Sequence, residues 1–113
     1  MPVNSRQKGK RGELEAAALL REHGFVARRG QQFAGGPDSP DLVTDLEGFH
    51  VEVKRTQRLD LYAAVSQADE EKKEGDQPLV LHRMNRRPWL VTMLAEDFFD
   101  LLNQYVFEPR ERD

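Results

Sequence analysis

Residues 40–54 read PDLVTDLEGFHVEVK, and this stretch carries the strongest strand pattern in the chain. Its first part, residues 41–44, has the pattern of a short strand. Leu46-Glu47-Gly48 then supplies a turn, and residues 49–54 alternate apolar and polar side chains, as in a strand with one buried face. The stretch therefore predicts two neighbouring strands, joined by a tight turn, in the core of a sheet.

The alternation sends Glu52 and Lys54 to one face of the second strand, and Val51 and Val53 to the other. Pairing across the predicted hairpin would bring Asp41 beside Glu52. Two adjacent carboxylates resist joint ionisation unless a cation lies between them, and a hard divalent ion such as Mg²⁺ or Mn²⁺ fits that need. A solvated hairpin face that carries these charges by chance is the alternative.

A third acid lies upstream, on a predicted helix. Residues 11–23 are rich in Ala and Leu, and Gly24 is placed to end the helix. Glu13 lies one turn before the apolar residue Ala17, so we expect it on the face that packs against the sheet. The alternative is an acid of the first turn that only complements the helix dipole, a role that Glu15 can fill equally.

Together these segments resemble the archaeal-type Holliday junction resolvases and their phage relatives, in the PD-(D/E)xK nuclease superfamily. The resemblance runs from residue 9 to about residue 94, and it is carried by Gly9-Lys10-Arg11-Gly12-Glu13, His23-Gly24-Phe25, Arg29, Pro40-Asp41 and Glu52-Val53-Lys54. It implies a restriction-endonuclease-like α/β fold, with a mixed sheet of about five strands flanked by helices. It also implies a homodimer that cuts four-way DNA junctions with Mg²⁺, for which Mn²⁺ can substitute.

Carried over residue by residue, the resemblance names the active site as Glu13, Asp41, Glu52 and Lys54. Asp41, Glu52 and the Val53 carbonyl would bind the metal, joined by Glu13 directly or through water. The ion would polarise the scissile phosphate and activate water, while Lys54 orients that water or stabilises negative charge. Asp38, which follows Pro37, is a rival for the motif aspartate. Asp41 is preferred because it opens a strand.

DNA contacts are expected from basic and polar residues around this site. The resemblance makes Arg29 a phosphate contact, but Leu14 stands where the archaeal enzymes tend to have a basic residue, so Lys10 or Arg11 is a candidate replacement. Other candidates come from the Gly/Pro-rich loop 31–39, from a basic cluster after the motif strand and from the second helix, and they are Ser39, Arg55 and Gln67. A plain connecting loop and a solvated glutamine are the alternatives.

Charge distribution supports a nucleic-acid partner despite a net charge of −3. Residues 1–29 hold seven Lys and Arg against three acids, and further basic residues follow at 54–58 and 83–87. Acids concentrate in residues 69–76 and in the last helix and tail. We expect a basic face and an acidic back, with scattered solvated charge as the alternative.

Composition fits one small nuclease domain over residues 1–113, with flexible ends at 1–8 and 108–113. The chain has no cysteine, and its three histidines form no zinc pattern, so we expect them on the surface or in strands. No apolar run approaches the length of a membrane span. We expect a cytoplasmic protein of a bacterium, an archaeon or a phage-infected cell.

The other predicted elements complete the order α-β-β-β-α-β-β-α. They are strands at 25–29, 79–81 and 89–93, a helix at 61–73 ended by Gly75, and a final helix. The strand at 79–81 is apolar throughout, which indicates burial on both faces. The last helix has an apolar stripe, extended by Phe99 and Val106, that consists of Phe98, Leu101, Leu102 and Tyr105. Such a surplus of apolar residues predicts a dimer interface, unless the helix lies in a groove of its own domain.

The sequence thus predicts a phosphodiester hydrolase that acts on four-way junctions. Two alternatives remain. One is a restriction, nicking or repair nuclease of the same fold that acts on duplex or flap DNA, because the motif determines the chemistry but not the DNA shape. The other is a non-catalytic DNA-binding protein, against which the full set of four active-site residues argues.

Overall fold

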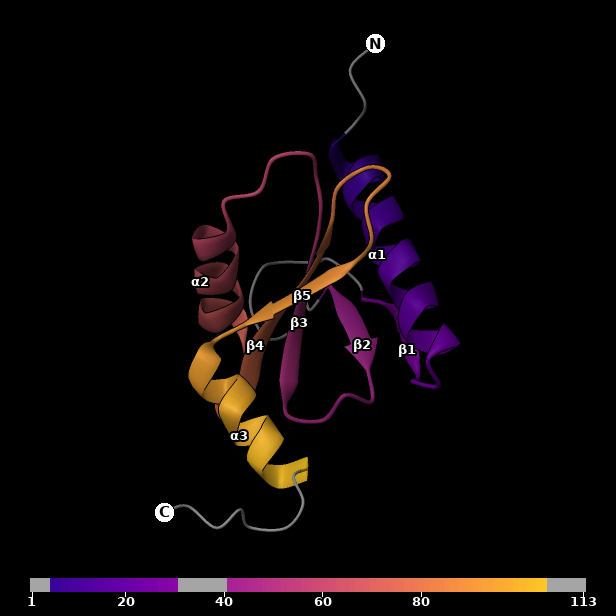
Figure 1. Ribbon diagram of the computed structural model, residues 1–113. Coiled ribbons are helices and arrows are strands. Elements are labelled where there is room, and N and C mark those ends of the chain that lie inside the picture. The colour runs from indigo at the N-terminus through magenta and orange to yellow at the C-terminus, as the bar shows by residue number, and fades with distance from the viewer. Residues whose placement is uncertain (1–4, 31–40, 106–113) are drawn as a thin grey trace.

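The computed structural model describes residues 5–30 and 41–105, and its elements follow the predicted order (Figure 1). In chain order they are α1 (Ser5–Glu22), β1 (Ala27–Arg29), β2 (Leu42–Thr44), β3 (Phe49–Arg55), α2 (Leu61–Glu71), β4 (Gln77–Arg83), β5 (Leu90–Met93) and α3 (Ala95–Tyr105). The first helix begins six residues earlier than the sequence predicts. No helix in the described ranges is long and apolar enough to cross a membrane.

The strands form two ladders, and the predicted mixed α/β fold is confirmed. The larger sheet has the order β3-β4-β5, in which β3 and β4 run parallel with Val53 opposite Leu81. β5 returns antiparallel to β4. The smaller sheet is an antiparallel pair of β1 and β2, with Ala27 opposite Thr44. Because α2 connects the parallel strands β3 and β4, these three elements form a βαβ unit.

The predicted ladder between β2 and β3 is wrong, although the turn between them is correctly placed. In the described part of the chain β2 pairs with β1, and no ladder joins it to β3. The turn is closed by a hydrogen bond from Phe49 N to Leu46 O of 3.3 Å, and Gly48 has the positive φ of 85° that this turn requires. A backbone ladder between β2 and β3 is replaced here by a side-chain contact. The carboxylate of Asp41 accepts a hydrogen bond from Val53 N, on the edge of β3 that faces away from β4.

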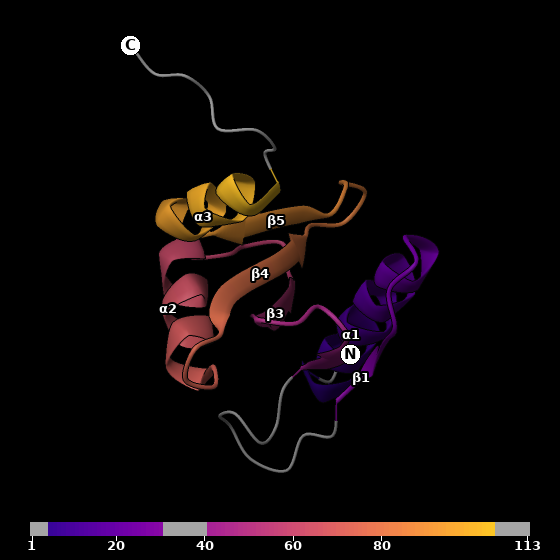
Figure 2. The same ribbon diagram turned by 90° about the horizontal axis from the view of Figure 1, so that it is seen from below.

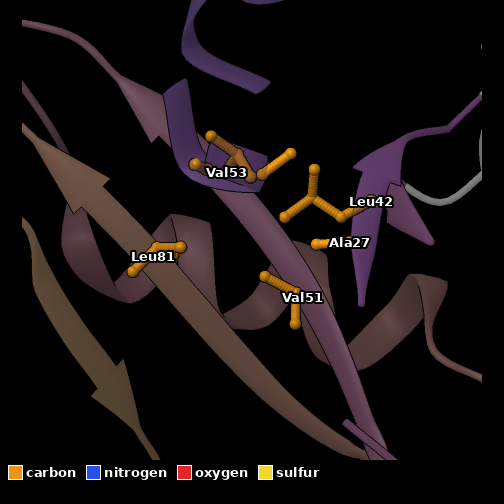
Figure 3. Close-up of a cluster of buried hydrophobic side chains, with 7 residues drawn as sticks. Ala27, Leu42, Val51, Val53 and Leu81 are labelled. Atoms are coloured by element: carbon orange, nitrogen blue, oxygen red, sulfur yellow. The ribbon is translucent and has the colours of Figure 1, made fainter. Parts of the chain in front are cut away.

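Helices cover both faces of the larger sheet, α1 on one and α2 on the other (Figure 2). The core on the α1 side, drawn in Figure 3, combines helix and strand residues: Ala16, Ala17, Ala27, Leu42, Val51, Val53 and Leu81. On the α2 side Ala64 and Ala68 pack on Val80. Val80 and Leu81 are consecutive in β4 and point to opposite faces, so the prediction that this strand is buried on both faces is confirmed.

Helix α1 approaches β3 closely because residue 12 is glycine. A Cβ atom at Gly12 would lie 2.5 Å from the Cβ of Arg55, well inside van der Waals contact. The absence of a side chain at this position lets the first half of α1 lie directly on the C-terminal end of β3. The next residue, Glu13, is thereby held against the end of the sheet where the motif residues lie.

The glycines that follow α1 and α2, Gly24 and Gly75, have different roles. Gly24, with φ of 91°, ends α1 as predicted, and Phe25 N donates to Leu20 O at 3.0 Å in the pattern of a Schellman motif. The prediction that Gly75 ends the second helix is wrong. α2 ends at Glu71, and Gly75 instead lies in the turn that leads into β4.

Helix α3 lies beside β5, next to one end of α2 (Figures 1 and 2). None of its residues is buried within the domain. Its large apolar side chains keep much of their surface exposed, with 57% for Phe99 and 68% for Tyr105. Val106, which the sequence adds to this stripe, lies outside the described residues.

Candidate functional site

Asp41 connects the two sheets. Its backbone carbonyl accepts a hydrogen bond from Gly30 N at 2.9 Å, which extends the pairing of β1 and β2. Its side-chain Oδ2 accepts a hydrogen bond from Val53 N at 2.8 Å, on the edge of β3 that faces away from β4. In a strand the N–H and C=O of one residue point to the same side, so the Val53 carbonyl also faces the side of Asp41.

Glu52, the next residue back along β3, has a buried carboxylate with 3% of its residue surface exposed. Its Oε1 accepts a hydrogen bond from Gln67 Nε2 at 3.1 Å and lies 3.9 Å from Lys54 Nζ. Its Oε2 lies 3.4 Å from His50 Nε2. Burial raises the pKa of Glu52 to about 7; the contact with His50 opposes this rise, and the charge of Asp41 adds to it.

Gln67 of α2 holds the two motif side chains of β3 together. Its Oε1 accepts a hydrogen bond from Lys54 Nζ at 2.8 Å, while its Nε2 donates to Glu52 and, at 3.2 Å, to Glu71 Oε1. Glu52 and Lys54 therefore lie on one face of the strand, as the alternation predicts. Gln67 was expected as a DNA contact or as a solvated side chain, and in the structure it is bonded to these residues instead.

Glu13 enters from α1, and the prediction that it lies on the inward face is confirmed. It is 8% exposed and accepts a hydrogen bond from Arg29 Nε at 2.7 Å. Burial raises the pKa of Glu13; the hydrogen bond from Arg29 opposes that rise, and the neighbouring Asp41 adds to it. Glu13 and Glu52 therefore both lie within electrostatic range of Asp41.

These groups suit a hard divalent cation. Glu52 Oε2 is buried and has no hydrogen-bond partner in the described ranges. Glu13, Asp41 and Glu52 form a group of carboxylates in which the charge of Asp41 opposes ionisation of the other two. A cation among them would relieve this repulsion, and carboxylate and carbonyl oxygens are the ligands that Mg²⁺ and Mn²⁺ prefer.

The sequence analysis missed two residues of this neighbourhood, His50 and Glu71. His50 lies in a strand, one of the two placements expected for it, but its burial at 6% exposed was not expected. It shares strand parity with Glu52, and Glu71 follows Gln67 by one helical turn. These spacings are visible in the sequence, but their meaning depends on how α2 docks on the sheet.

The predicted DNA contacts differ in how free their side chains are. Lys10 and Arg11 are exposed on α1, beside the exposed Leu14. Arg29 keeps 31% of its side chain exposed while it pairs with Glu13. Ser39 lies outside the described residues, as do the rest of the loop 31–39 and the rival Asp38.

Arg55 is the most constrained of these candidates. Its Nε pairs with Glu15 Oε2 at 3.1 Å, and its guanidinium also donates to Asn85 Oδ1 at 2.7 Å. Arg83 donates to the other oxygen of Glu15 at 2.9 Å. Glu15 thus joins α1 to the ends of β3 and β4.

Comparison with known proteins gives a structural relative. No protein-family model matches the chain, and no curated protein matches it by sequence. Among solved structures, the chain is similar to Hjc of Archaeoglobus fulgidus, a Holliday junction resolvase from an archaeal hyperthermophile. The two are 26% identical, the match covers 76% of this chain and 72% of that one, and the TM-score is 0.57. This likeness supports the predicted archaeal-type resolvase family and agrees with the restriction-endonuclease-like fold.

Proposed function

We propose that this chain, a structural relative of an archaeal Holliday junction resolvase, is a Mg²⁺-dependent endonuclease that cuts four-way DNA junctions. The observation that carries the proposal is the bond from Val53 N to Asp41 Oδ2, because it fixes the motif aspartate at the free edge of β3 beside Glu52 and Lys54. The sequence motif predicts this arrangement for a metal-dependent nuclease. The contact that brings Asp41 to β3 is a side-chain hydrogen bond and not the predicted pairing of β2 with β3.

The metal ligands in this proposal are Asp41, Glu52 and the Val53 carbonyl, with Glu13 direct or through water. A bound Mg²⁺ would polarise the scissile phosphate and lower the pKa of an attacking water molecule. Glu13 approaches from α1 with one oxygen held by Arg29, so its carboxylate is oriented before any ion arrives. Such prior orientation reduces the free-energy cost of assembling the site.

Lys54 is the proposed donor to the reacting phosphate or its attacking water. Its ammonium group is held at Gln67 Oε1, and its side chain is 28% exposed, so it can reach a substrate without leaving the face of β3. A fixed positive charge stabilises the negative charge that develops on the phosphate oxygens as the bond breaks. Gln67 acts as a positioning residue, since it contacts both Lys54 and Glu52.

The DNA backbone would lie along the basic residues around this site. Arg29, Lys10 and Arg11 keep exposed surface and are proposed to contact phosphates, as is Ser39 of the loop before Asp41. For Arg55 a phosphate would have to compete with Glu15, so we assign it a weaker contact. Such contacts give affinity without sequence preference, which suits a nuclease that recognises DNA shape.

A second copy of the chain is proposed to pack against α3. Resolving a junction needs cuts in two opposed strands, and a two-fold dimer supplies two sites with the required symmetry. The described part of α3 offers an apolar surface that its own domain leaves open, formed by Phe98, Phe99, Leu102 and Tyr105. An apolar surface of this kind is typical of a protein–protein interface.

Cleavage of a labelled four-way junction, compared with its separate linear arms, tests the proposed substrate. We expect paired cuts near the crossover in Mg²⁺ and little cutting of the arms, with Glu52→Gln as the inactive control. Equal cutting of junction and arms would instead indicate a duplex nuclease of the same fold. Tight junction binding without cutting in either Mg²⁺ or Mn²⁺ would indicate a DNA-binding protein without catalytic activity.

A further inference from the structure

On the α2 face of β3, three potential metal ligands converge beside the proposed nuclease centre. One ligand atom each from His50, Glu52 and Glu71 lies within 4.8 Å of the others. Two of these groups come from alternate residues of β3, and the third is the last residue of α2. Asp41 and Glu13 are not part of this set.

Two buried atoms in the cluster lack a hydrogen-bond partner. His50 Nε2 and Glu52 Oε2 are enclosed and unpartnered in the described ranges, and their side chains are 5% and 4% exposed. Burying a polar atom without a partner is costly, so a structure that keeps two of them side by side leaves a ligand to be explained. The two atoms face each other at 3.4 Å.

That separation matches a shared transition metal. Zn²⁺ binds imidazole nitrogen and carboxylate oxygen at about 2.0–2.2 Å, and in a tetrahedral site two such ligands lie about 3.4 Å apart. A hydrogen bond between these atoms would be shorter, at about 2.7–2.9 Å. The distance is therefore compatible with two ligands around one ion, and it is also that of a loose ion pair between His50 and Glu52.

We propose that His50, Glu52 and Glu71 form a second cation site, which takes a transition-metal ion such as Zn²⁺. The imidazole makes the donor set softer than the all-oxygen set around Asp41, and it favours Zn²⁺ over Mg²⁺. Glu71 stands at the C-terminal end of α2, where the helix dipole favours a positive charge. A water molecule would complete a tetrahedral set of four ligands.

Neighbouring groups support the site without filling it. Gln67 Nε2 donates to both Glu52 Oε1 and Glu71 Oε1, which orients the two carboxylates toward each other as an outer-shell partner does. Lys54, the nearest cation to Glu52, lies on the Oε1 side and is held by Gln67. His50 also lines a surface pocket of about 480 Å³.

Zinc titration of the full chain, by calorimetry after chelator treatment, tests the site. We place Asp41→Asn in every sample to weaken the nuclease centre, which shares Glu52, so that the effect of a further substitution at Glu71 reports on this second site whether or not the chain is a nuclease. We expect one zinc ion per chain. Adding Glu71→Gln should weaken zinc binding. Loss of an outer-shell partner costs roughly tenfold to hundredfold in metal affinity, and loss of a direct ligand should cost at least as much.

Matched controls separate this site from general surface charge. Glu70→Gln removes the same charge from the neighbouring residue of α2, which is exposed, and His23→Gln removes an exposed imidazole. Neither should change the affinity. Equal weakening by Glu70→Gln and Glu71→Gln would overturn the proposal, as would an affinity that Glu71→Gln leaves unchanged.

Nitrogen NMR of the histidine rings tests the same site without altering any of its ligands. On addition of one equivalent of zinc, the Nε2 signal of His50 should shift to the range of a metal-bound nitrogen, while His23 and His82 stay unchanged. A His50 Nε2 signal that does not move in excess zinc would mean that the cluster binds no ion, and it would overturn the proposal.

Discussion

Helices α1 and α3 both carry apolar faces, but only α1 has that face buried in its own domain. Ala16 and Ala17 of α1 are almost fully enclosed, and the helix brings Glu13 to the end of β3. In α3 no residue is buried, although Phe99 and its neighbours form an apolar surface. The difference indicates that α1 builds the site and that α3 is available for a contact outside the domain.

The largest effect should come from removing a charge at the site that α1 helps to build. Asp41→Asn and Glu52→Gln each delete a proposed metal ligand without adding bulk, so Mg²⁺-dependent cleavage should fall below detection while junction binding persists. Cleavage assays and gel-shift binding on the same samples measure both. Full activity in Asp41→Asn would refute the metal assignment and favour Asp38.

Loss of the ammonium group beside these carboxylates should have the next largest effect. Lys54→Ala is expected to slow cleavage about a hundredfold or more, as loss of one transition-state donor does. Single-turnover rates under saturating enzyme isolate this chemical step from binding. Lys54→Arg keeps the charge and is the matched control. A rate for Lys54→Ala within a few-fold of wild type would exclude a direct role in the reaction.

The buried carboxylate at the site should also make the stability of the metal-free protein depend on pH. Burial raises the pKa of Glu52 from 4.5 to about 7, so between these values the folded state binds more protons than the unfolded state. The free energy of unfolding should therefore fall as pH rises from about 4.5 to 7, by up to about 3 kcal/mol at about 1.4 kcal/mol for each pKa unit.

Urea denaturation at pH 5 and pH 8, in the presence of a chelator, measures that loss of stability. Glu52→Gln should show a much flatter dependence, because the residue no longer titrates. Glu13, whose pKa is also raised by burial, should leave a smaller residual slope in the same direction. Parallel pH profiles for wild type and Glu52→Gln would contradict the assignment of this effect to Glu52.

A smaller effect is expected at the DNA contact that borders the site. If Arg29 binds a phosphate, Arg29→Ala should reduce the magnitude of the log–log salt dependence of junction binding by about 0.9. Binding at several salt concentrations gives the slope. Arg21→Ala is a matched control, because it also removes an arginine, but one that donates a hydrogen bond to the Ala27 carbonyl. An unchanged slope in Arg29→Ala would mean that the arginine serves only Glu13.

The smallest effect on stability is expected from a substitution on the exposed face of α3. This result would strengthen the contrast with the buried face of α1. Phe99→Glu should change the free energy of domain unfolding by no more than about 0.5 kcal/mol, as at other surface sites. It should nevertheless give a monomer that nicks junctions without paired cuts. Gln104→Glu, exposed on another side of α3, is the control. Sedimentation of the wild type as a monomer at micromolar concentration would count against the interface.

The sequence predicts most of the fold and the proximity of the motif residues, because these depend on local periodicity. Period-two alternation places Glu52 with Lys54, and helical spacing places Glu13 inward. The pairing of β2 could not be predicted, since the Asp41 carboxylate competes with a backbone ladder for Val53 N–H. Burial of His50 was missed because it depends on the docking of α2.

Crystals of the protein soaked in Mn²⁺ test the central claim most directly, because anomalous scattering locates the ion without reference to activity. We expect a peak bounded by the carboxylates of Asp41 and Glu52 and by the Val53 carbonyl, and the loss of that peak in Asp41→Asn. A manganese ion bound only elsewhere, with Asp41 still accepting from Val53 N and no peak beside it, would contradict the account.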